Sequence, residues 1–203
     1  MTANPTLIYL HGFRSSSKSV KAQLFVRAVQ ALPDSTRPHL YVPDLPFDPV
    51  AAISSVAAWI ERELAGRDPA DELTLIGSSL GGFYATHLAE RFGARAAVIN
   101  PTTRPWDDLR PHAGAQTNLR SGEAFEVTEP HFRALRSLRV PRIARPERYF
   151  LLARSGDEVL PWRDAVAFYA GASQFIKGGG DHGWTDFADE IPSVLRFAGC
   201  IGA

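Results

Sequence analysis

The sequence lacks several features that would place it in common protein classes. Its single cysteine, Cys200, cannot form a disulfide within the chain, so we expect a reducing compartment. No apolar run approaches the roughly 18 residues that a membrane-spanning helix needs. Residues 1–10 have no basic stretch ahead of their short apolar run, so we expect no secretory signal. These absences predict a cytoplasmic protein without a membrane span.

The chain also lacks a surplus of charge of either sign. Its 22 basic residues equal its 22 acidic residues, whereas proteins that bind nucleic acid usually carry a basic surplus that neutralises phosphates. We therefore expect no nucleic-acid partner. A length of 203 residues with 45% hydrophobic content is ordinary for a folded protein and predicts a single domain over residues 1–203. The oligomeric state is not predicted.

Short apolar runs alternate with helix-length amphipathic stretches along most of the chain. This alternation predicts an α/β protein with a mainly parallel six-stranded sheet and helices on both faces. Strands are expected at residues 6–10, 39–42, 73–77, 96–100, 148–153 and 174–177. Helices are expected within residues 18–32, 48–64, 81–92, 163–169 and 184–197, the last starting or bending at Pro192.

The alternation lapses between residues 101 and 147, where prolines recur. A segment of this length without regular alternation is usually a functional loop. We therefore predict a lid insertion after the fourth strand, over the carboxyl ends of the strands, with one short helix at 129–138. A basic run follows, made of Arg133, Arg136, Arg139, Arg142, Arg145 and Arg148. It is interpreted either as a solvated face or as a surface that attracts an anionic leaving group.

A G-x-S-x-G pattern carries the first chemical signal. Gly77-Ser78-Ser79-Leu80-Gly81 directly follows the apolar run 73–76 and directly precedes the helical run from residue 81. This strand–turn–helix setting is what a nucleophile elbow requires, and glycines at 77 and 81 remove side chains that would clash with the turn. The pattern predicts Ser79 as a nucleophile.

A serine hydroxyl needs a base and a carboxylate that orients the base. In proteins with a nucleophile elbow on an α/β sheet, the acid follows the serine in the chain and the histidine follows the acid. His182 lies past the last predicted strand and Asp157 past the one before it. Because parallel strands end at one edge of the sheet, both should lie near Ser79. Glu158 and Asp181 remain alternative acids, and His11 an alternative base.

Two backbone amides are expected to form an oxyanion hole. Leu80 follows the nucleophile, and Phe13 follows the first strand. With strand order 2-1-3-4-5-6, the first and third strands are neighbours and these amides flank one crevice.

Candidate pocket residues lie close to these positions in the sequence. They are His11, which is expected to shape the oxyanion loop, and Phe83, Tyr84 and Trp184. The alternative for the aromatic side chains is packing in the core. The remaining histidines lack the spacing of metal ligands, so no metal and no cofactor are predicted.

Taken together, these motifs resemble the α/β-hydrolases, and more narrowly the YqiA-type bacterial esterases. The matching stretches are 10–13, 77–86, 100–101, 156–160 and 178–182, together with Ser15, Ser16, Ser19, Lys21, Arg104 and Pro105. The resemblance implies a compact hydrolase acting on acyl esters and thioesters, with its triad on Ser79, Asp157 and His182. Asp181 departs from the family pattern, which has asparagine there, and this keeps the choice of acid open.

The sequence therefore predicts a serine esterase that cleaves a small-molecule acyl ester through a covalent acyl-enzyme, with the length of the acyl chain left open. Two alternatives remain. The same site would also serve an acyl-CoA thioesterase, and an inert hydrolase scaffold would serve as a ligand-binding module.

Overall fold

A six-stranded parallel sheet forms the centre of the computed structural model, which describes residues 4–202. Its order is β2-β1-β3-β4-β7-β8, and all neighbouring strands are parallel. The strands are β1 (Thr6–Leu10), β2 (His39–Tyr41), β3 (Leu73–Ser78), β4 (Arg95–Ile99), β7 (Tyr149–Arg154) and β8 (Ser173–Lys177). The predicted α/β class is confirmed. The order differs from the predicted 2-1-3-4-5-6 only because two further strands, β5 and β6, precede the last two along the chain.

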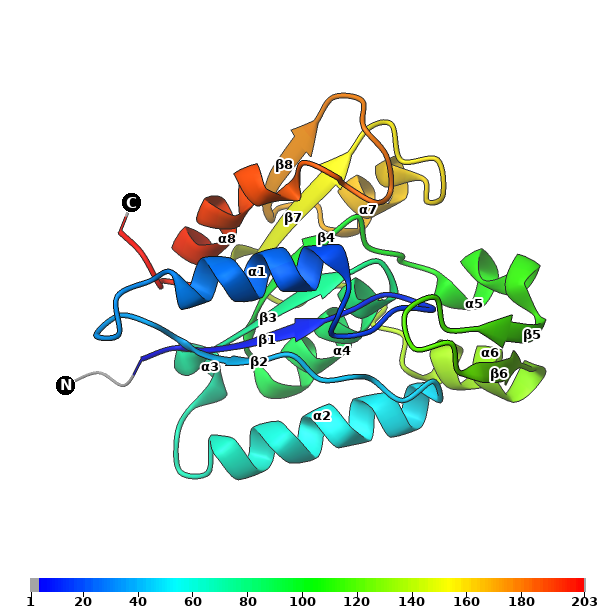
Figure 1. Cartoon of the computed structure of the whole chain (residues 1–203), viewed down its shortest axis with the longest axis horizontal. Helices are drawn as coiled ribbons and strands as arrows, with labels where there is room; N and C mark the ends of the chain where they lie inside the picture. Colours follow the sequence, from blue (N-terminus) through cyan, green and yellow to red (C-terminus); the bar gives the residue numbers. More distant parts are fainter. Residues whose placement is uncertain (1–3, 203) are drawn as a thin grey trace.

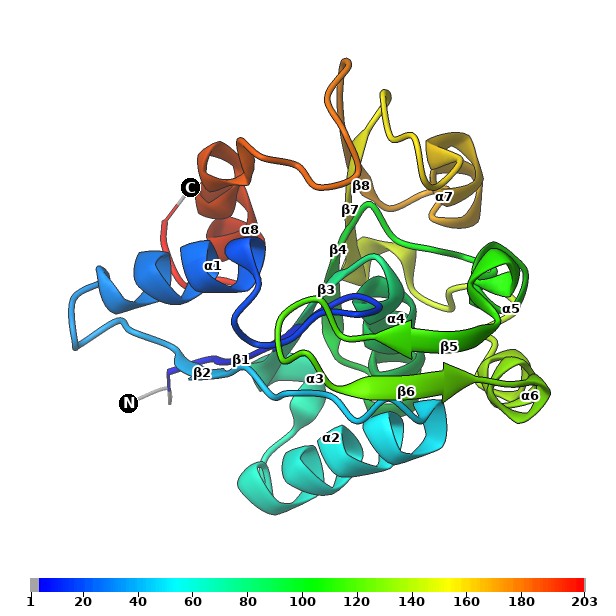
Figure 2. The ribbon, with the colours of Figure 1, turned by 45° about the vertical axis from the view of Figure 1, so that its right-hand side comes forward.

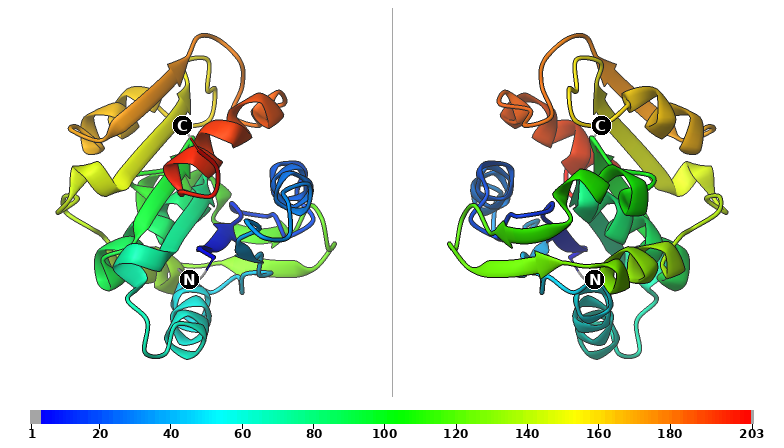
Figure 3. Two further views of the ribbon diagram at one scale, coloured as in Figure 1. Left: turned by 90° about the vertical axis from the view of Figure 1, so that its left-hand side faces the viewer. Right: turned by 90° about the vertical axis from the view of Figure 1, so that its right-hand side faces the viewer.

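Helices cover both faces of this sheet (Figure 1 and Figure 3). One face carries α1 (Val20–Gln30) and α8 (Ile191–Phe197). The other carries α2 (Pro49–Glu63), α4 (Leu80–Phe92) and α7 (Trp162–Phe168), and a short helix α3 (Pro69–Glu72) leads into β3. Among residues 4–202, no helix is both long enough and apolar enough to cross a membrane.

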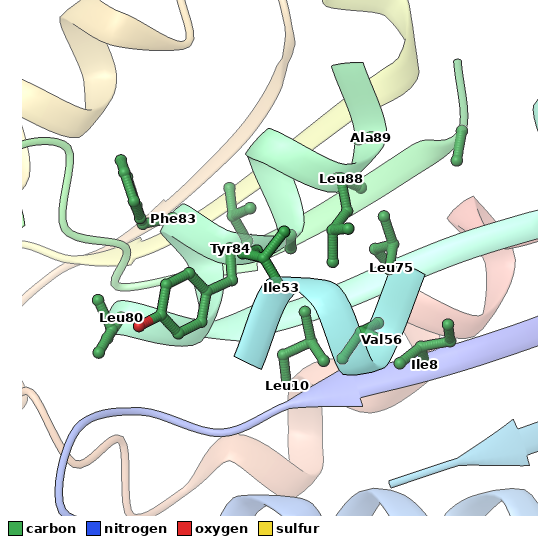
Figure 4. Packing of buried hydrophobic residues seen from close by; sticks show 14 of the residues in the cluster. Ile8, Leu10, Ile53, Val56, Leu75, Leu80, Phe83, Tyr84, Leu88 and Ala89 are labelled. Carbon is green, nitrogen blue, oxygen red and sulfur yellow. The ribbon is translucent and has the colours of Figure 1, made fainter. Parts of the chain in front are cut away.

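Alternate side chains of the strands enter two separate hydrophobic cores. Ile8 and Leu10 of β1 pack with α2 and α4, as Figure 4 shows. Leu7 and Tyr9 of the same strand pack with α1 and α8 on the opposite face. All four are fully buried, which explains why apolar residues follow one another without alternation.

The helix ends follow local sequence signals. The Asp48 carboxylate accepts a hydrogen bond from the Ala51 amide at 2.8 Å, and Pro49 occupies the first turn of α2. Ser19 caps α1 in the same way. Helix α8 begins at Ile191 with Pro192 in its first turn, so the proline starts this helix instead of bending it.

The 101–147 insertion contains more regular structure than the sequence predicted. Helix α6 (Glu129–Ser137) lies where a helix was expected, but α5 (Pro105–Asp108) and an antiparallel hairpin of β5 (Gly114–Thr117) and β6 (Ala124–Val127) also form. The expectation of a segment without strands was wrong. Each hairpin strand has only four residues, two of them exposed, so no apolar run marks it. The hairpin lies beyond the carboxyl end of β1 (Figure 1 and Figure 2). Short 3-10 turns occur at Arg110–His112, Pro146–Arg148 and Phe187–Glu190.

Packing of α1 on the sheet gives a test of the fold. Phe25 is fully buried, and its ring centroid lies 5.7 Å from that of Tyr9. We expect Phe25→Ala to lower the free energy of unfolding by about 3–5 kcal/mol, because the change removes buried surface and leaves a cavity. Urea denaturation followed by circular dichroism measures this. Phe175→Ala, at a residue that is 38% exposed on β8, should cost less than about 1 kcal/mol. An equal loss in the two variants would contradict this packing.

Candidate active site

The predicted nucleophile, Ser79, lies on the tight turn between β3 and α4. Its backbone has φ 56° and ψ −120°, a combination that an L-residue adopts at a cost of about 1–3 kcal/mol. A side chain at Gly77 would collide with the carbonyl of Gly81, and a side chain at Gly81 would collide with the carbonyl of Leu10. The two glycines thus permit the turn, which sets Ser79 at the N-terminus of α4 and at the carboxyl edge of the sheet.

His182 reaches Ser79 from the loop between β8 and α8. The distance between His182 Nε2 and Ser79 Oγ is 3.1 Å, although the two residues are 103 positions apart in the chain. The ring is partly accessible, with 19% of the side chain exposed. This geometry places an imidazole nitrogen where it can accept the hydroxyl proton.

Asp157 lies on the other side of the His182 ring. Its Oδ2 is 2.7 Å from His182 Nδ1, while its Oδ1 accepts hydrogen bonds from the amides of Val159 and Leu160 at 2.9 and 2.8 Å. Burial raises the pKa of the Asp157 carboxyl, but the hydrogen bonds from His182 and the two amides outweigh it and hold the pKa below its ordinary value. The carboxylate is therefore charged at neutral pH and can accept the Nδ1 proton.

The two alternative acids contact the same loop without reaching the ring. Glu158 Oε2 accepts a hydrogen bond from the backbone amide of His182 at 3.0 Å. Asp181 Oδ1 accepts from the amide of Trp184 at 2.7 Å. The structure thus brings Asp157 against the imidazole, and it uses Glu158 and Asp181 to hold the backbone around it.

His11, the alternative base, is buried with both ring nitrogens engaged. Nδ1 lies 3.0 Å from the Gly12 carbonyl, and Nε2 accepts a hydrogen bond from the Leu45 amide at 3.0 Å. Burial lowers the pKa of the ring, which favours the neutral form with its proton on Nδ1. His11 therefore shapes the loop after β1.

Within residues 4–202, no three histidine, cysteine or acidic side chains form a group that could hold a metal ion.

The two predicted oxyanion donors lie on either side of Ser79. Strands β1 and β3 are neighbours with Leu10 opposite Gly77. The loop after β1 passes so close that a Cβ on Gly12 would lie 3.1 Å from Ser79 Cβ. Leu80 is the first residue of α4, where the amide has no partner inside the helix. Neither this amide nor that of Phe13 donates a hydrogen bond to another atom of residues 4–202.

Two cavities open on this loop. One cavity is lined by polar side chains that include Ser79, His182, Ser15, Ser19 and Lys21. A second cavity shares Phe13 with the first and is lined by the apolar residues Leu45, Phe47, Leu80, Tyr84 and Phe125 together with the polar residues Arg14, Asn118 and Glu123. Below, they are called the polar cavity and the apolar cavity.

Only some of the predicted pocket residues reach these cavities. His11 lines both, and Tyr84 lines the apolar one. Phe83 instead packs on α5, with its ring 6.2 Å from that of Trp106. Trp184 is 1% exposed and packs in the core against Phe187. The expectation that Trp184 forms a pocket wall is therefore wrong, because its side chain packs in the core. Phe83 lines a separate cavity with Thr102 and Phe168, so its role in substrate binding stays a prediction.

Two residues at the site received no role from the sequence. Asn100 follows β4, and its amide nitrogen donates to the His182 carbonyl at 3.1 Å, while its Oδ1 accepts from the Arg154 amide at 2.8 Å. Lys21 Nζ donates to the carbonyls of His182 and Gly183 at 3.2 and 2.9 Å. Both residues are among those that carry the family resemblance, which gave them no role, and Asn100 is also a polar residue directly after a buried strand.

Two arginines of the basic run lie away from the site. Arg145 donates to the Gly93 carbonyl and Arg148 to the Ala70 carbonyl. Gly93 and Ala70 precede β4 and β3, so these two arginines lie at the amino edge of the sheet, opposite Ser79. Arg145 and Arg148 are therefore too far from Ser79 to attract an anionic leaving group, and the hypothesis is wrong for these two arginines.

Comparisons with known proteins agree with this fold. Residues 6–199 match the model of a family described as Uncharacterised protein family (UPF0227). The chain belongs to this family. It is the YqiA-type family that the motifs indicated. This match and the solved structures described next together support the assignment of the chain to the α/β-hydrolase superfamily.

Solved structures similar to this UPF0227 member are α/β-hydrolases. Alpha/beta hydrolase domain-containing protein 10 from mouse is 16% identical, with a TM-score of 0.69 over 96% of this chain and 89% of that chain. A monoacylglycerol lipase from Paleococcus ferrophilus is 13% identical, with a TM-score of 0.70 over 98% and 97% of the two chains. The esterase domain of a Rhodothermus marinus protein is 17% identical, with a TM-score of 0.68 over 98% and 88%. At these identities the similarity shows the fold.

Proposed function

We propose that this protein is a serine hydrolase that cleaves carboxylic esters. One observation carries the proposal, namely the line of hydrogen bonds from Asp157 through the His182 ring to Ser79 Oγ. Its members come from three separate loops at one edge of the sheet, and the serine lies on a strained turn. A structural serine requires neither the strain nor a histidine held by a carboxylate.

In the proposed reaction, Ser79 Oγ attacks the ester carbonyl carbon while His182 Nε2 takes its proton. Asp157 keeps the other ring proton on Nδ1 and stabilises the imidazolium that forms. His182 then gives the proton to the leaving alkoxide as the carbon–oxygen bond breaks. Water, deprotonated by the same nitrogen, attacks the acyl-enzyme and releases the acid and free Ser79.

Negative charge on the carbonyl oxygen would be held by the amides of Phe13 and Leu80. Each such donor is worth roughly 3–4 kcal/mol where mutation has measured it. The N-terminus of α4 adds a favourable dipole at the same point. Both amides are unused by residues 4–202, so they are available to the substrate.

We assign the acyl group to the apolar cavity and the leaving group to the polar one. The apolar cavity shares Phe13 and Leu80 with the oxyanion site and is walled by Phe47 and Phe125, whose ring centroids are 4.0 Å apart. The polar cavity contains His182, which must protonate the leaving group. Because Phe125 lies on β6, the hairpin of the 101–147 insertion acts in this proposal as a lid over the acyl group.

The thioesterase alternative uses the same site but has no observation of its own. Its specific support was an arginine surface for the phosphates of coenzyme A, and Arg145 and Arg148 lie at the far edge of the sheet. The reactivity of Ser79 distinguishes the two remaining possibilities, because a serine hydrolase reacts with a covalent probe at Ser79 and a ligand-binding module does not.

Covalent labelling tests the nucleophile. With a fluorophosphonate probe, we expect one adduct per chain, mapped to Ser79, and none in Ser79→Ala. The same change should lower kcat on p-nitrophenyl butyrate by about 10⁶, as removal of a triad serine does elsewhere. Ser54→Ala, at an exposed position on α2, should label normally. Folded wild-type protein that takes no label would instead favour the binding module.

The acid is tested by two asparagine variants of neighbouring loops. Asp157→Asn should lower kcat by about 10⁴, because the amide no longer selects the ring tautomer that leaves Nε2 free to accept a proton. Asp181→Asn should lower kcat less than tenfold, since the Asp181 carboxylate accepts hydrogen bonds from Trp184 and Thr185 in the turn that follows His182 and from neither ring nitrogen. A larger loss in Asp181→Asn would refute the assignment.

The acyl assignment predicts the dependence on chain length. With p-nitrophenyl esters from acetate upward, kcat/KM should rise about fourfold per added methylene until the apolar cavity is full, because each buried methylene contributes about 0.8 kcal/mol. Phe125→Ala should flatten this dependence by opening the wall, whereas Phe175→Ala, on an edge strand of the main sheet, should leave it unchanged. An unaltered profile in Phe125→Ala would place the acyl group elsewhere.

A further inference from the structure

We infer that Lys21 is a positioning residue for His182, acting from helix α1 through the backbone of the histidine loop. The inference rests on the proposed ester hydrolysis and names a residue to which neither the motifs nor the triad assigned a role. Lys21 is the second residue of α1, and its side chain lines the polar cavity together with Ser79 and His182.

The Lys21 ammonium contacts the backbone of His182 and of the residue after it. Nζ donates to the carbonyl of His182 at 3.2 Å and to that of Gly183 at 2.9 Å. Hydrogen bonds from a charged donor are roughly twice as strong as neutral ones. Two of the three N–H donors of Lys21 thus bind the two peptide groups on either side of the Gly183 Cα. Gly183 directly follows His182.

The histidine loop needs such an anchor because its approach is made of glycine. Gly178, Gly179 and Gly180 precede His182, and the last two have φ 63° and 75°. Glycine loses more conformational freedom on ordering than any other residue. The loop must nevertheless hold His182 Nε2 at 3.1 Å from Ser79 Oγ, and a displacement of about 1 Å can lower a rate about 10²-fold.

Lys21 completes a set of three anchors on the His182 backbone. Glu158 accepts from the amide of His182, and Asn100 donates to its carbonyl. Each anchor comes from a different part of the fold: the loop after β7, the end of β4 and helix α1. Of the three, Lys21 alone brings a positive charge to the loop.

The charge of Lys21 depends on pH in the working range. Burial lowers the pKa of its ammonium to about 8, although the facing carboxylates of Asp157 and Asp181 oppose this. The His182 ring faces the same cavity, and α1 has no acidic residue in its first turn. As pH rises through about 8, the ammonium becomes a neutral amine and its bonds to the two carbonyls weaken.

The test compares Lys21→Met with Lys21→Arg and with Lys18→Met, a matched change at an exposed lysine on the preceding turn. On p-nitrophenyl butyrate, Lys21→Met should lower kcat by roughly tenfold to a hundredfold and change KM by less than about threefold. Lys21→Arg, which keeps the charge at every accessible pH, should retain most of kcat. Lys18→Met should match wild type.

The pH profile supplies a readout that a purely structural role would not move. Wild-type kcat should decline above a pH of about 8, and this decline should be absent in Lys21→Arg and Lys21→Met. Fluorophosphonate labelling confirms that Ser79 is still accessible in each folded variant, with a slower rate expected in Lys21→Met.

Three results would overturn the inference. These are a Lys21→Met variant with kcat within twofold of wild type, a loss confined to KM, which would mean that Lys21 contacts the substrate, and an unchanged alkaline decline in both variants. Each leaves the proposed ester hydrolysis intact, because wild-type labelling and turnover are measured in the same series. A wild-type protein that neither labels nor turns over would overturn the proposed function itself.

Discussion

The turn at Ser79 is the constraint on which the rest of the site depends. It is closed by contacts in which glycine alone fits, since Gly81 packs against the carbonyl of Leu10 in β1. The amide of Ser79 also donates to the carbonyl of Ile99 in β4 at 3.0 Å. The serine is therefore fixed by three central strands at once. The loop after β1 and the start of α4, which carry the unused amides, meet at this point for the same reason.

The histidine is held in a different way. Ser79 derives its position from backbone packing in a buried sheet, whereas His182 stands on a glycine-rich loop whose position depends on polar contacts with Glu158, Asn100 and Lys21. A serine fixed by the sheet thus faces a histidine whose position depends on a few polar contacts. In such a pair, substitutions beside the serine are expected to act on folding, and substitutions around the histidine on the rate of reaction.

The sequence predicted the features that local residue patterns determine, and it missed those that depend on the conformation of loops. The strands and the elbow were predictable because runs such as 73–81 carry their own pattern. The sequence named Asp157 as the acid but left Glu158 and Asp181 open, because only the loop conformation decides which carboxylate contacts the His182 ring. Trp184 follows the histidine closely, but its backbone has φ 51°, which turns the side chain into the core. The hairpin of the 101–147 insertion was not predicted because its strands are short and only partly buried.

The distance of 103 residues between the serine and its histidine has a consequence for the growing chain. The nucleophile is synthesised long before the base, and the sheet around it can begin to pair while β7 and β8 are still missing. A chain interrupted before residue 182 would hold an ordinary serine hydroxyl without a proton acceptor. In the proposed mechanism, Ser79 becomes reactive only when the last loop docks against α1 and β4, so that an incomplete chain is inactive.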